Sequence, residues 1–282
     1  MRQRRTRLAL KLAGALGLCG CAGTAPSAEA PQEPATKPAA PPPATSTAAP
    51  APRDEKPRES LNDEAASKPD MPPAGAPLDR IMRAHFKDAL LIRKAIISGK
   101  SEDAANPATV LALIETLDDL PPGWRPFVER MQADARHIRD STSAAQAAAA
   151  TADLGVACGL CHQKLGGPKV SSEPAPAPGT SVDARMQVHA WASERLWEGL
   201  TVPSGEAWAK GAKALSASPF PEEVLTHGGV HARSAASEFA KIVVRAPSKK
   251  TTEERAALYA ELLVTCGGCH RATSEGGAKL PP

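Results

Sequence analysis

Aromatic residues are scarce in this chain, and so is any net charge once the N-terminus is set aside. The 282 residues include four Phe, four Trp and one Tyr. A core made of side chains alone would therefore depend on Ala and Leu, and we expect another large apolar group to help fill it. The first twenty residues carry five basic groups and no acidic one, and the remaining 29 basic residues face 31 acidic ones. A net charge near −2 for the rest of the chain gives no reason to expect nucleic acid as a partner.

The N-terminus lacks an apolar run long enough to span a bilayer unaided, because the run from Leu8 to Leu18 is too short. Basic residues precede it, as in a secretory signal peptide. Leu18 lies three residues before Cys21 and Gly20 lies directly before it, which resembles the lipobox of bacterial lipoproteins. We expect residues 1–20 to be removed and Cys21 to be lipidated, anchoring the protein to a membrane, preferentially the outer membrane. Ordinary secretion with cleavage after Ala22 is the alternative.

Large apolar residues are also missing from the segment that follows. Fourteen of the 28 prolines lie between Ala22 and Pro77, beside only two large apolar residues, Leu61 and Met71. Such a segment cannot bury enough apolar surface to fold. We expect residues 21–77 to form a disordered Pro/Ala-rich tether that acts as a spacer, and residues 275–282 to form a flexible tail.

Behind this segment the chain repeats itself. The pattern Met82-Arg-Ala-His85 recurs as Met186-Gln-Val-His189, and Cys158-Gly-Leu-Cys161-His162 recurs as Cys266-Gly-Gly-Cys269-His270. The copies are separated by 104 residues for the first pattern and by 108 for the second. This order and spacing indicate a tandem duplication. The predicted units cover 78–165 and 182–274, with a Pro-rich linker over 166–181.

Each unit shows helical periodicity, and no segment has a convincing strand pattern. In the first unit we expect one helix over about 78–99, a second with Asn106 as its cap and Pro107 in its first turn, a third over about 125–138, and a fourth that Ser143 and Gln146 open. In the second unit we expect one helix over about 182–200, a second after Ser204, a third over about 230–244, and a fourth that Thr251 and Glu254 open. The sequence thus predicts an all-α fold of two tandem antiparallel four-helix bundles.

The Cys-x-x-Cys-His segments carry the chemistry, each at the end of its unit's last helix. This pentapeptide is the attachment signal of c-type haem. Cysteines three residues apart share a helix face, from which both thiols can add to the haem vinyl groups, and the following His can reach the iron. The alternatives are a thioredoxin-like redox pair, a four-cysteine zinc site across the units, and two disulfides. Two copies in register favour two covalently attached haems.

With these motifs in place, each unit resembles a class II cytochrome c of the cytochrome c-prime type. That family has four-helix bundles with Cys-x-x-Cys-His near the C-terminus and a first helix over the distal haem face. The resemblance covers about 78–165 and 182–274 and implies that His162 and His270 are the proximal iron ligands. The units are short for the family, and the paired Met-x-x-His departs from its pattern.

The sixth ligand has two candidates in each unit, because Met and His three residues apart face the same side of a helix and both ligate haem iron. We favour His85 and His189 over Met82 and Met186, since a buried imidazole that recurs in both copies needs a binding partner. An open site in at least one unit is the alternative. We expect His137, His227 and His231 to be surface or helix-end residues, and Lys164 and Arg271 to lie on the solvated surface.

These features predict a membrane-tethered dihaem c-type cytochrome that transfers electrons to redox proteins of the bacterial cell envelope. The alternative is a protein that binds or senses NO or CO at an open haem. A dihaem peroxidase is disfavoured, because in that class the attachment motif comes near the start of a domain, whereas here it comes at the end of each unit. No acid-base pair suited to catalysis emerges, so we expect an electron carrier and not an enzyme.

Overall fold

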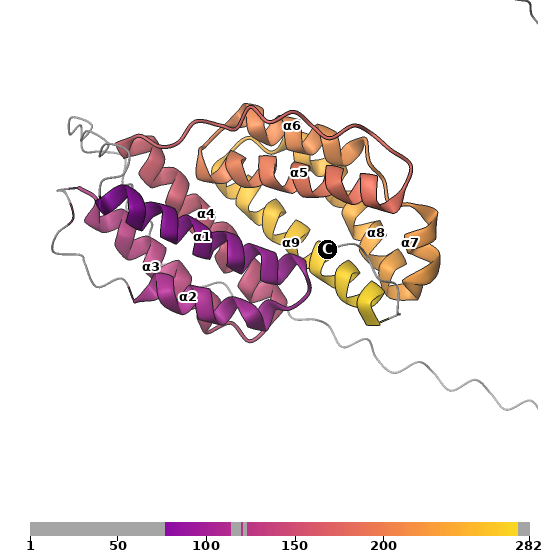
Figure 1. Cartoon of the computed structure of the whole chain (residues 1–282), viewed down its shortest axis with the longest axis horizontal. Coiled ribbons are helices and arrows are strands. Elements are labelled where there is room, and N and C mark those ends of the chain that lie inside the picture. The colour runs from indigo at the N-terminus through magenta and orange to yellow at the C-terminus, as the bar shows by residue number, and fades with distance from the viewer. Residues whose placement is uncertain (1–76, 114–119, 121–122, 276–282) are drawn as a thin grey trace, which may run out of the picture. The chain divides into compact units, whose positions relative to one another are not determined.

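The computed structural model describes residues 77–113, 120 and 123–275, all within the compact unit Asp63–Pro282. Within these ranges every regular element is helical and no strand occurs, which confirms the predicted all-α class (Figure 1). The helices are α1 (Pro77–Ile97), α2 (Ala105–Ala112), α3 (Arg125–Arg139), α4 (Ala144–Leu165), α5 (Val182–Thr201), α6 (Gly205–Ser216), α7 (Glu222–His227), α8 (Gly229–Arg245) and α9 (Thr252–Glu275). The short 3-10 helices η1 (Ser101–Ala104) and η2 (Ala246–Ser248) precede α2 and α9.

Several helices begin where the sequence predicts, because a side chain satisfies their first backbone N–H groups. The Ser143 hydroxyl accepts from the Gln146 N–H at 3.2 Å, and the Ser204 hydroxyl accepts from the Ala207 N–H at 3.1 Å. At α9 the bonds are reciprocal. The Thr251 hydroxyl accepts from the Glu254 N–H at 3.2 Å, and the Glu254 carboxylate accepts from the Thr251 N–H at 3.1 Å. This is the complete capping box that the sequence predicts.

Two local expectations were wrong. Asn106 does not cap α2, because η1 leads directly into that helix and Ala104 is the N-cap residue. The second half also contains the short helix α7, which the four-helix expectation did not include. No side chain caps α7, although Pro221 and the acidic Glu222 and Glu223 mark its first turn.

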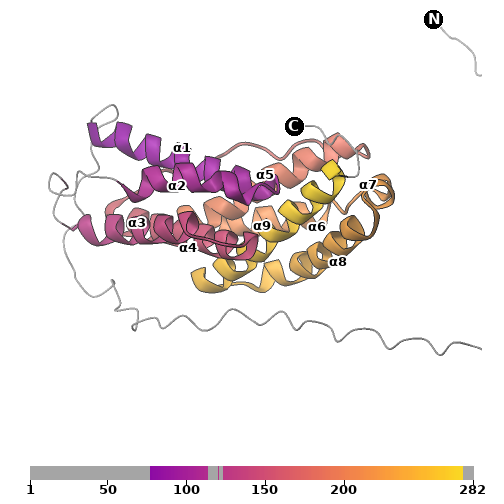
Figure 2. The same cartoon turned by 90° about the horizontal axis from the view of Figure 1, so that it is seen from below.

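The two halves of the repeat share one apolar core. The motif-bearing helices α4 and α9 lie side by side and pack against each other (Figure 1, Figure 2). Each also packs against the first helix of the other half, α4 against α5 and α9 against α1. One buried cluster therefore includes Ile92 and Leu154 from the first half with Trp197 and Tyr259 from the second. Alanines of α4, such as Ala148, are fully buried there, in keeping with the predicted reliance on small side chains.

A glycine in each attachment motif makes this packing close. A Cβ atom on Gly159 would overlap the carbonyl oxygen of Leu200, and a Cβ atom on Gly267 would overlap that of Ile96. Leu200 follows Ile96 by 104 residues and Gly267 follows Gly159 by 108, the same offsets that separate the repeated sequence patterns. The two contacts are therefore equivalent, and each motif docks on the end of the other half's first helix.

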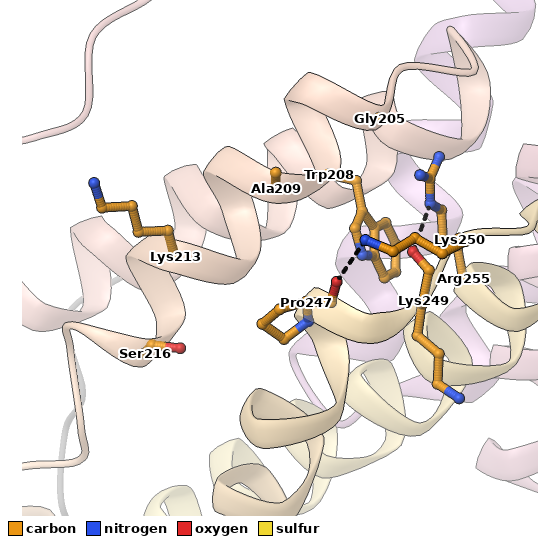
Figure 3. Close-up of a pocket in the computed structure, with 9 residues that line it drawn as sticks. All are labelled: Gly205, Trp208, Ala209, Lys213, Ser216, Pro247, Lys249, Lys250 and Arg255. Carbon is orange, nitrogen blue, oxygen red and sulfur yellow. Dashed lines mark hydrogen bonds between the residues drawn. The ribbon is translucent and has the colours of Figure 1, made fainter.

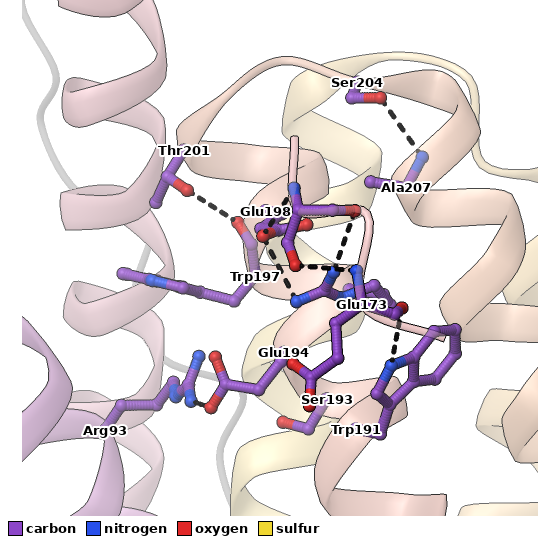
Figure 4. A network of polar contacts seen from close by, with 12 residues as sticks. Arg93, Glu173, Trp191, Ser193, Glu194, Trp197, Glu198, Thr201, Ser204 and Ala207 are labelled. Atoms are coloured by element: carbon purple, nitrogen blue, oxygen red, sulfur yellow. Dashed lines mark hydrogen bonds and ion pairs between the residues drawn. The ribbon is translucent and has the colours of Figure 1, made fainter. Parts of the chain in front are cut away.

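The segment between α4 and α5 is held against α5 by a polar network (Figure 4). Arg195 donates to the carbonyl oxygen of Ser171 at 3.2 Å, and the Ser171 N–H donates to the Glu198 carboxylate at 3.3 Å. In the same region, buried Arg93 of α1 forms an ion pair with Glu194 of α5. These contacts fix the second half against the first at the level of α1 and α5.

The predicted signal peptide, Cys21, the tether and nearly all of the predicted C-terminal tail lie outside the described residues. Among the residues that are described, α4 alone is long and apolar enough to cross a membrane. More than half of that apolar stretch is buried inside the fold, as in the core helix of a packed domain.

Candidate haem sites

The two Cys-x-x-Cys-His motifs lie inside the last long helix of each half, Cys158–His162 within α4 and Cys266–His270 within α9. In each motif the residue after the first cysteine is the glycine that contacts the other half. Successive residues of a helix are about 100° apart, so the two cysteines of each motif lie about 100° and about 160° around the helix from that glycine, and the histidine lies about 60° from it. The glycine side of each motif faces the other half of the chain, and the cysteines lie on other sides of the helix.

All four motif thiols are free in the structure. Burial raises the pKa of Cys158 to about 12, that of Cys161 to about 11 and that of Cys266 to about 12, and it also raises the pKa of Cys269. A thioredoxin-like pair needs a thiol with a lowered pKa, so these environments argue against that alternative. Thioether formation removes the thiol altogether.

His162 is oriented by the other half of the chain. Its Nδ1 donates to the carbonyl oxygen of Thr201 at 2.6 Å. Thr201 is the last residue of α5, where backbone carbonyl groups lack a partner within the helix. The bond selects the tautomer in which Nε2 carries the free lone pair, which is the arrangement typical of a metal-ligating histidine. Thr201 could not be predicted from the sequence, since any residue can supply a backbone acceptor.

The histidines of both repeated patterns are half-buried, and burial lowers the pKa of each. This holds for His162 and His270 in the motifs and for His85 and His189 on the first helices. The lowered pKa keeps each imidazole neutral at pH 7, and the neutral ring is the form that binds iron.

In the first half, an apolar cluster separate from the main core surrounds the attachment motif. It brings Met82 of α1 into contact with residues of α3 and α4. Its members are Met82, Leu120, Trp124, Phe127, Leu160, Cys161 and Leu165. Two buried polar atoms in this region, His85 Nδ1 and Trp124 Nε1, lack a hydrogen-bond partner among the described residues. An unpartnered imidazole nitrogen in this position is free to bind a further group.

In the second half, His189 has different surroundings from His85. The His189 ring stacks on Phe239 with centroids 5.0 Å apart, and it meets Phe220 edge-on at 5.2 Å. Its Nε2 donates to the carbonyl oxygen of Ser218. Burial is the main cause of the lowered pKa of His189, and the charges of Arg185 and His270 add to it. His189 is already hydrogen-bonded, unlike His85.

Within the described ranges no group of three or more His, Cys, Asp or Glu could hold a metal ion, which leaves a four-cysteine zinc site without support. Haem iron needs fewer protein ligands than zinc, because the porphyrin supplies four nitrogen ligands and the protein supplies at most one on each face. The buried thiols, the neutral histidines and the orphaned His85 Nδ1 fit such a group. His162 and His270 would hold it on one face.

The remaining candidates divide by position. His137 and His231 are exposed, in agreement with their expected surface location, whereas the side chain of His227 lies outside the described atoms. Arg271 is exposed, as expected, but it also has a structural contact. Its guanidinium donates to the Gly99 carbonyl oxygen through Nε at 3.1 Å and Nη2 at 2.8 Å, so it ties α9 to the end of α1. Gly99 has φ +76°, a left-handed conformation that ends α1 and aims this carbonyl at α9.

None of the family models, curated proteins or solved structures compared with this chain matches it. The class of the protein is therefore argued from the two motifs, their environments and the helical fold.

Proposed function

We propose that this protein is a membrane-tethered dihaem c-type cytochrome that carries electrons in the bacterial cell envelope. The observation that carries the proposal is the repeated Cys-x-x-Cys-His on the last helix of each half, with its thiols protonated and its histidine neutral. The proposed haem-binding units are residues 78–165 and 182–274, which we propose to be four-helix arrangements of the class II cytochrome type, with the short α7 as an addition in the second, joined through the shared core.

The chain's own residues would fix each haem and adjust its electronic properties. Cys158 and Cys161, and likewise Cys266 and Cys269, would hold it by thioether bonds. A bound c-type haem supplies an iron that accepts and releases one electron. His162 would bind that iron through Nε2, while the Thr201 carbonyl oxygen holds Nδ1 and makes the ring a stronger donor. A stronger donor favours the oxidised iron and lowers the reduction potential.

For the sixth position, the two halves support different proposals. His85 has an unpartnered Nδ1 and stands one helical turn after Met82, so it is the proposed distal ligand of the first haem. His189 would have to release Ser218 before its Nε2 could bind iron, with Met186 as the substitute on the same helix. This observation favours the second candidate function for the second half alone, namely NO or CO binding at an open haem.

The cell-envelope location is part of the same proposal. Lipidation at Cys21 after removal of residues 1–20 would anchor the protein to the outer membrane, and residues 21–77 would act as the tether. The partners would be redox proteins of the envelope, with no role for nucleic acid. We propose an electron carrier and not an enzyme.

Absorption spectra of the purified protein, oxidised, reduced, and reduced with CO, test this function. An electron carrier with two closed haems gives low-spin spectra, reversible reduction and little change with CO. Variants in which both cysteines of one motif are replaced by alanine assign each response to its haem. Strong CO binding by both haems of the unmutated protein would contradict the carrier and support the gas-binding function.

A further inference from the structure

A hollow on the second half is lined by basic residues and by none of the cysteines (Figure 3). It has a volume of about 310 Å³ and lies between α6 and the turn that leads into α9. The lining residues that matter here are Trp208, Lys213, Pro247, Lys249, Lys250 and Arg255. We call this hollow the cationic pocket.

The wall of the cationic pocket is held in place by packing and hydrogen bonds. Trp208 is buried and donates through Nε1 to the carbonyl oxygen of Ala246 at 2.9 Å. The guanidinium of Arg255 lies over the Trp208 ring, 5.6 Å from its centroid, and its Nε donates to the Lys249 carbonyl oxygen at 3.3 Å. Lys250 Nζ donates to the Pro247 carbonyl oxygen at 3.3 Å. These contacts orient two of the cations without neutralising them.

The charges of the pocket are poorly balanced. It is lined by four cationic side chains and by no acidic one. In the part of the chain that the structure describes, only Lys249 has a carboxylate at ion-pair distance, Glu254 at 3.9 Å. Partial burial of Arg255 lowers its pKa, and the Glu254 charge only partly opposes this. Four like charges around one hollow repel one another, and an anion bound among them would relieve that repulsion.

The repeat shows that the helical scaffold does not require this pocket. At the offset of 104 residues, Ala104 and Thr109 stand where the second half has Trp208 and Lys213. At the offset of 108, Ala147 stands where it has Arg255. The first half therefore has small, neutral residues at three positions that build the pocket in the second.

The turn before the last helix differs as well. Four residues separate the buried Ile138 from the N-cap Ser143 in the first half, and eight separate the equivalent Ile242 from Thr251 in the second. Those eight include η2 and the pocket residues Pro247, Lys249 and Lys250. The second half has thus gained both an inserted wall and its charges, while the helices around them have kept their positions in the repeat.

We propose that the cationic pocket binds a small multivalent anion that carries carboxylate or phosphate groups. The planar guanidinium of Arg255 suits either group, and the lysines add mobile positive charges around it. Trp208 provides an apolar wall for the body of the ligand. A hollow of about 310 Å³ is at the lower end of the range for small-molecule pockets, so a compact ligand fits better than a protein surface.

Calorimetric titration of the full-length, haem-loaded protein with pyrophosphate and with citrate tests this proposal. Saturable binding of either probe is expected, and the tighter one identifies phosphate or carboxylate as the preferred group. Lys213→Ala and Lys250→Ala each remove an exposed pocket cation and should weaken binding about tenfold, as expected for one lost charge-assisted hydrogen bond. Both side chains are exposed, so neither change threatens the fold.

Lys210→Ala is the matched control, because Lys210 lies on the same helix as Lys213 but outside the pocket, paired with Glu206 at 2.8 Å. Its affinity should stay within about twofold of the unmutated protein, as for a screened surface charge. The absence of saturable binding by both probes, or an equal loss in Lys210→Ala, would overturn the proposal. The measurement detects the anion and not the haem, so its outcome is independent of the proposed electron transfer.

Discussion

At the scale of single residues, the two halves of the repeat differ in the histidine of the first helix. His85 has a buried Nδ1 with no partner among the described residues, whereas His189 is stacked on Phe239 and donates to Ser218. The sequence presents these two histidines as equivalent. Their surroundings separate them, because a buried imidazole nitrogen without a partner destabilises the fold unless a further group binds it.

Replacing His85 tests its proposed role directly. His85→Ala should open the first haem to CO, so the reduced variant should bind CO at one more haem than the reduced unmutated protein. Met82→Leu is the matched control, since it keeps an apolar side chain in the cluster around Cys161 and should leave CO binding unchanged. If Met82→Leu opens the site and His85→Ala does not, Met82 is the distal ligand and our assignment is wrong.

At the scale of helices, most elements follow from local signals in the sequence. Ser143, Ser204 and Thr251 cap helices that were predicted from them, because a capping hydroxyl acts within three residues of itself. The short helix α7 was missed for the opposite reason, since no side chain caps it.

The docking of the halves could not be predicted in this way. The contact of Gly159 with Leu200 joins residues 41 positions apart, and a glycine within a haem motif gives no sign that its missing side chain makes room for another helix. The attachment cysteines and histidines were recognisable because their spacing is itself the chemical requirement. Thr201 acts through its backbone oxygen, and because every residue type has one, the sequence does not indicate this role.

The motif glycines provide a test of this docking. Gly159→Ala places a methyl group against the Leu200 carbonyl oxygen and should lower the free energy of unfolding by about 1–3 kcal/mol. It should also raise the potential of the first haem by disturbing the Thr201 carbonyl oxygen that holds His162. Denaturant unfolding followed by circular dichroism and a spectroelectrochemical titration measure the two effects.

Gly268→Ala is the control for this change. Gly268 lies in the other motif, and a Cβ atom there meets no atom within 4 Å. Alanine at that helical position should stabilise the protein by up to about 1 kcal/mol and leave the potential of the first haem unchanged. Equal destabilisation by the two substitutions would contradict the proposed docking role of Gly159.

At the scale of the whole molecule, the shared core links the two proposed haem units. Trp197 and Tyr259 of the second half are buried in the same cluster as Ile92 of the first. Under the proposed function, a haem in each half would add to one interior that is otherwise built with few aromatic side chains. The same arrangement places an acceptor from the second half on the proximal histidine of the first.

The intact mass of the denatured protein, matured in a host that attaches c-type haem, tests the central claim most directly. We predict a mass increase equal to two covalently bound haems, which falls to one haem when Cys158 and Cys161, or Cys266 and Cys269, are both replaced by alanine. A mature protein that retains no haem after denaturation would contradict the account.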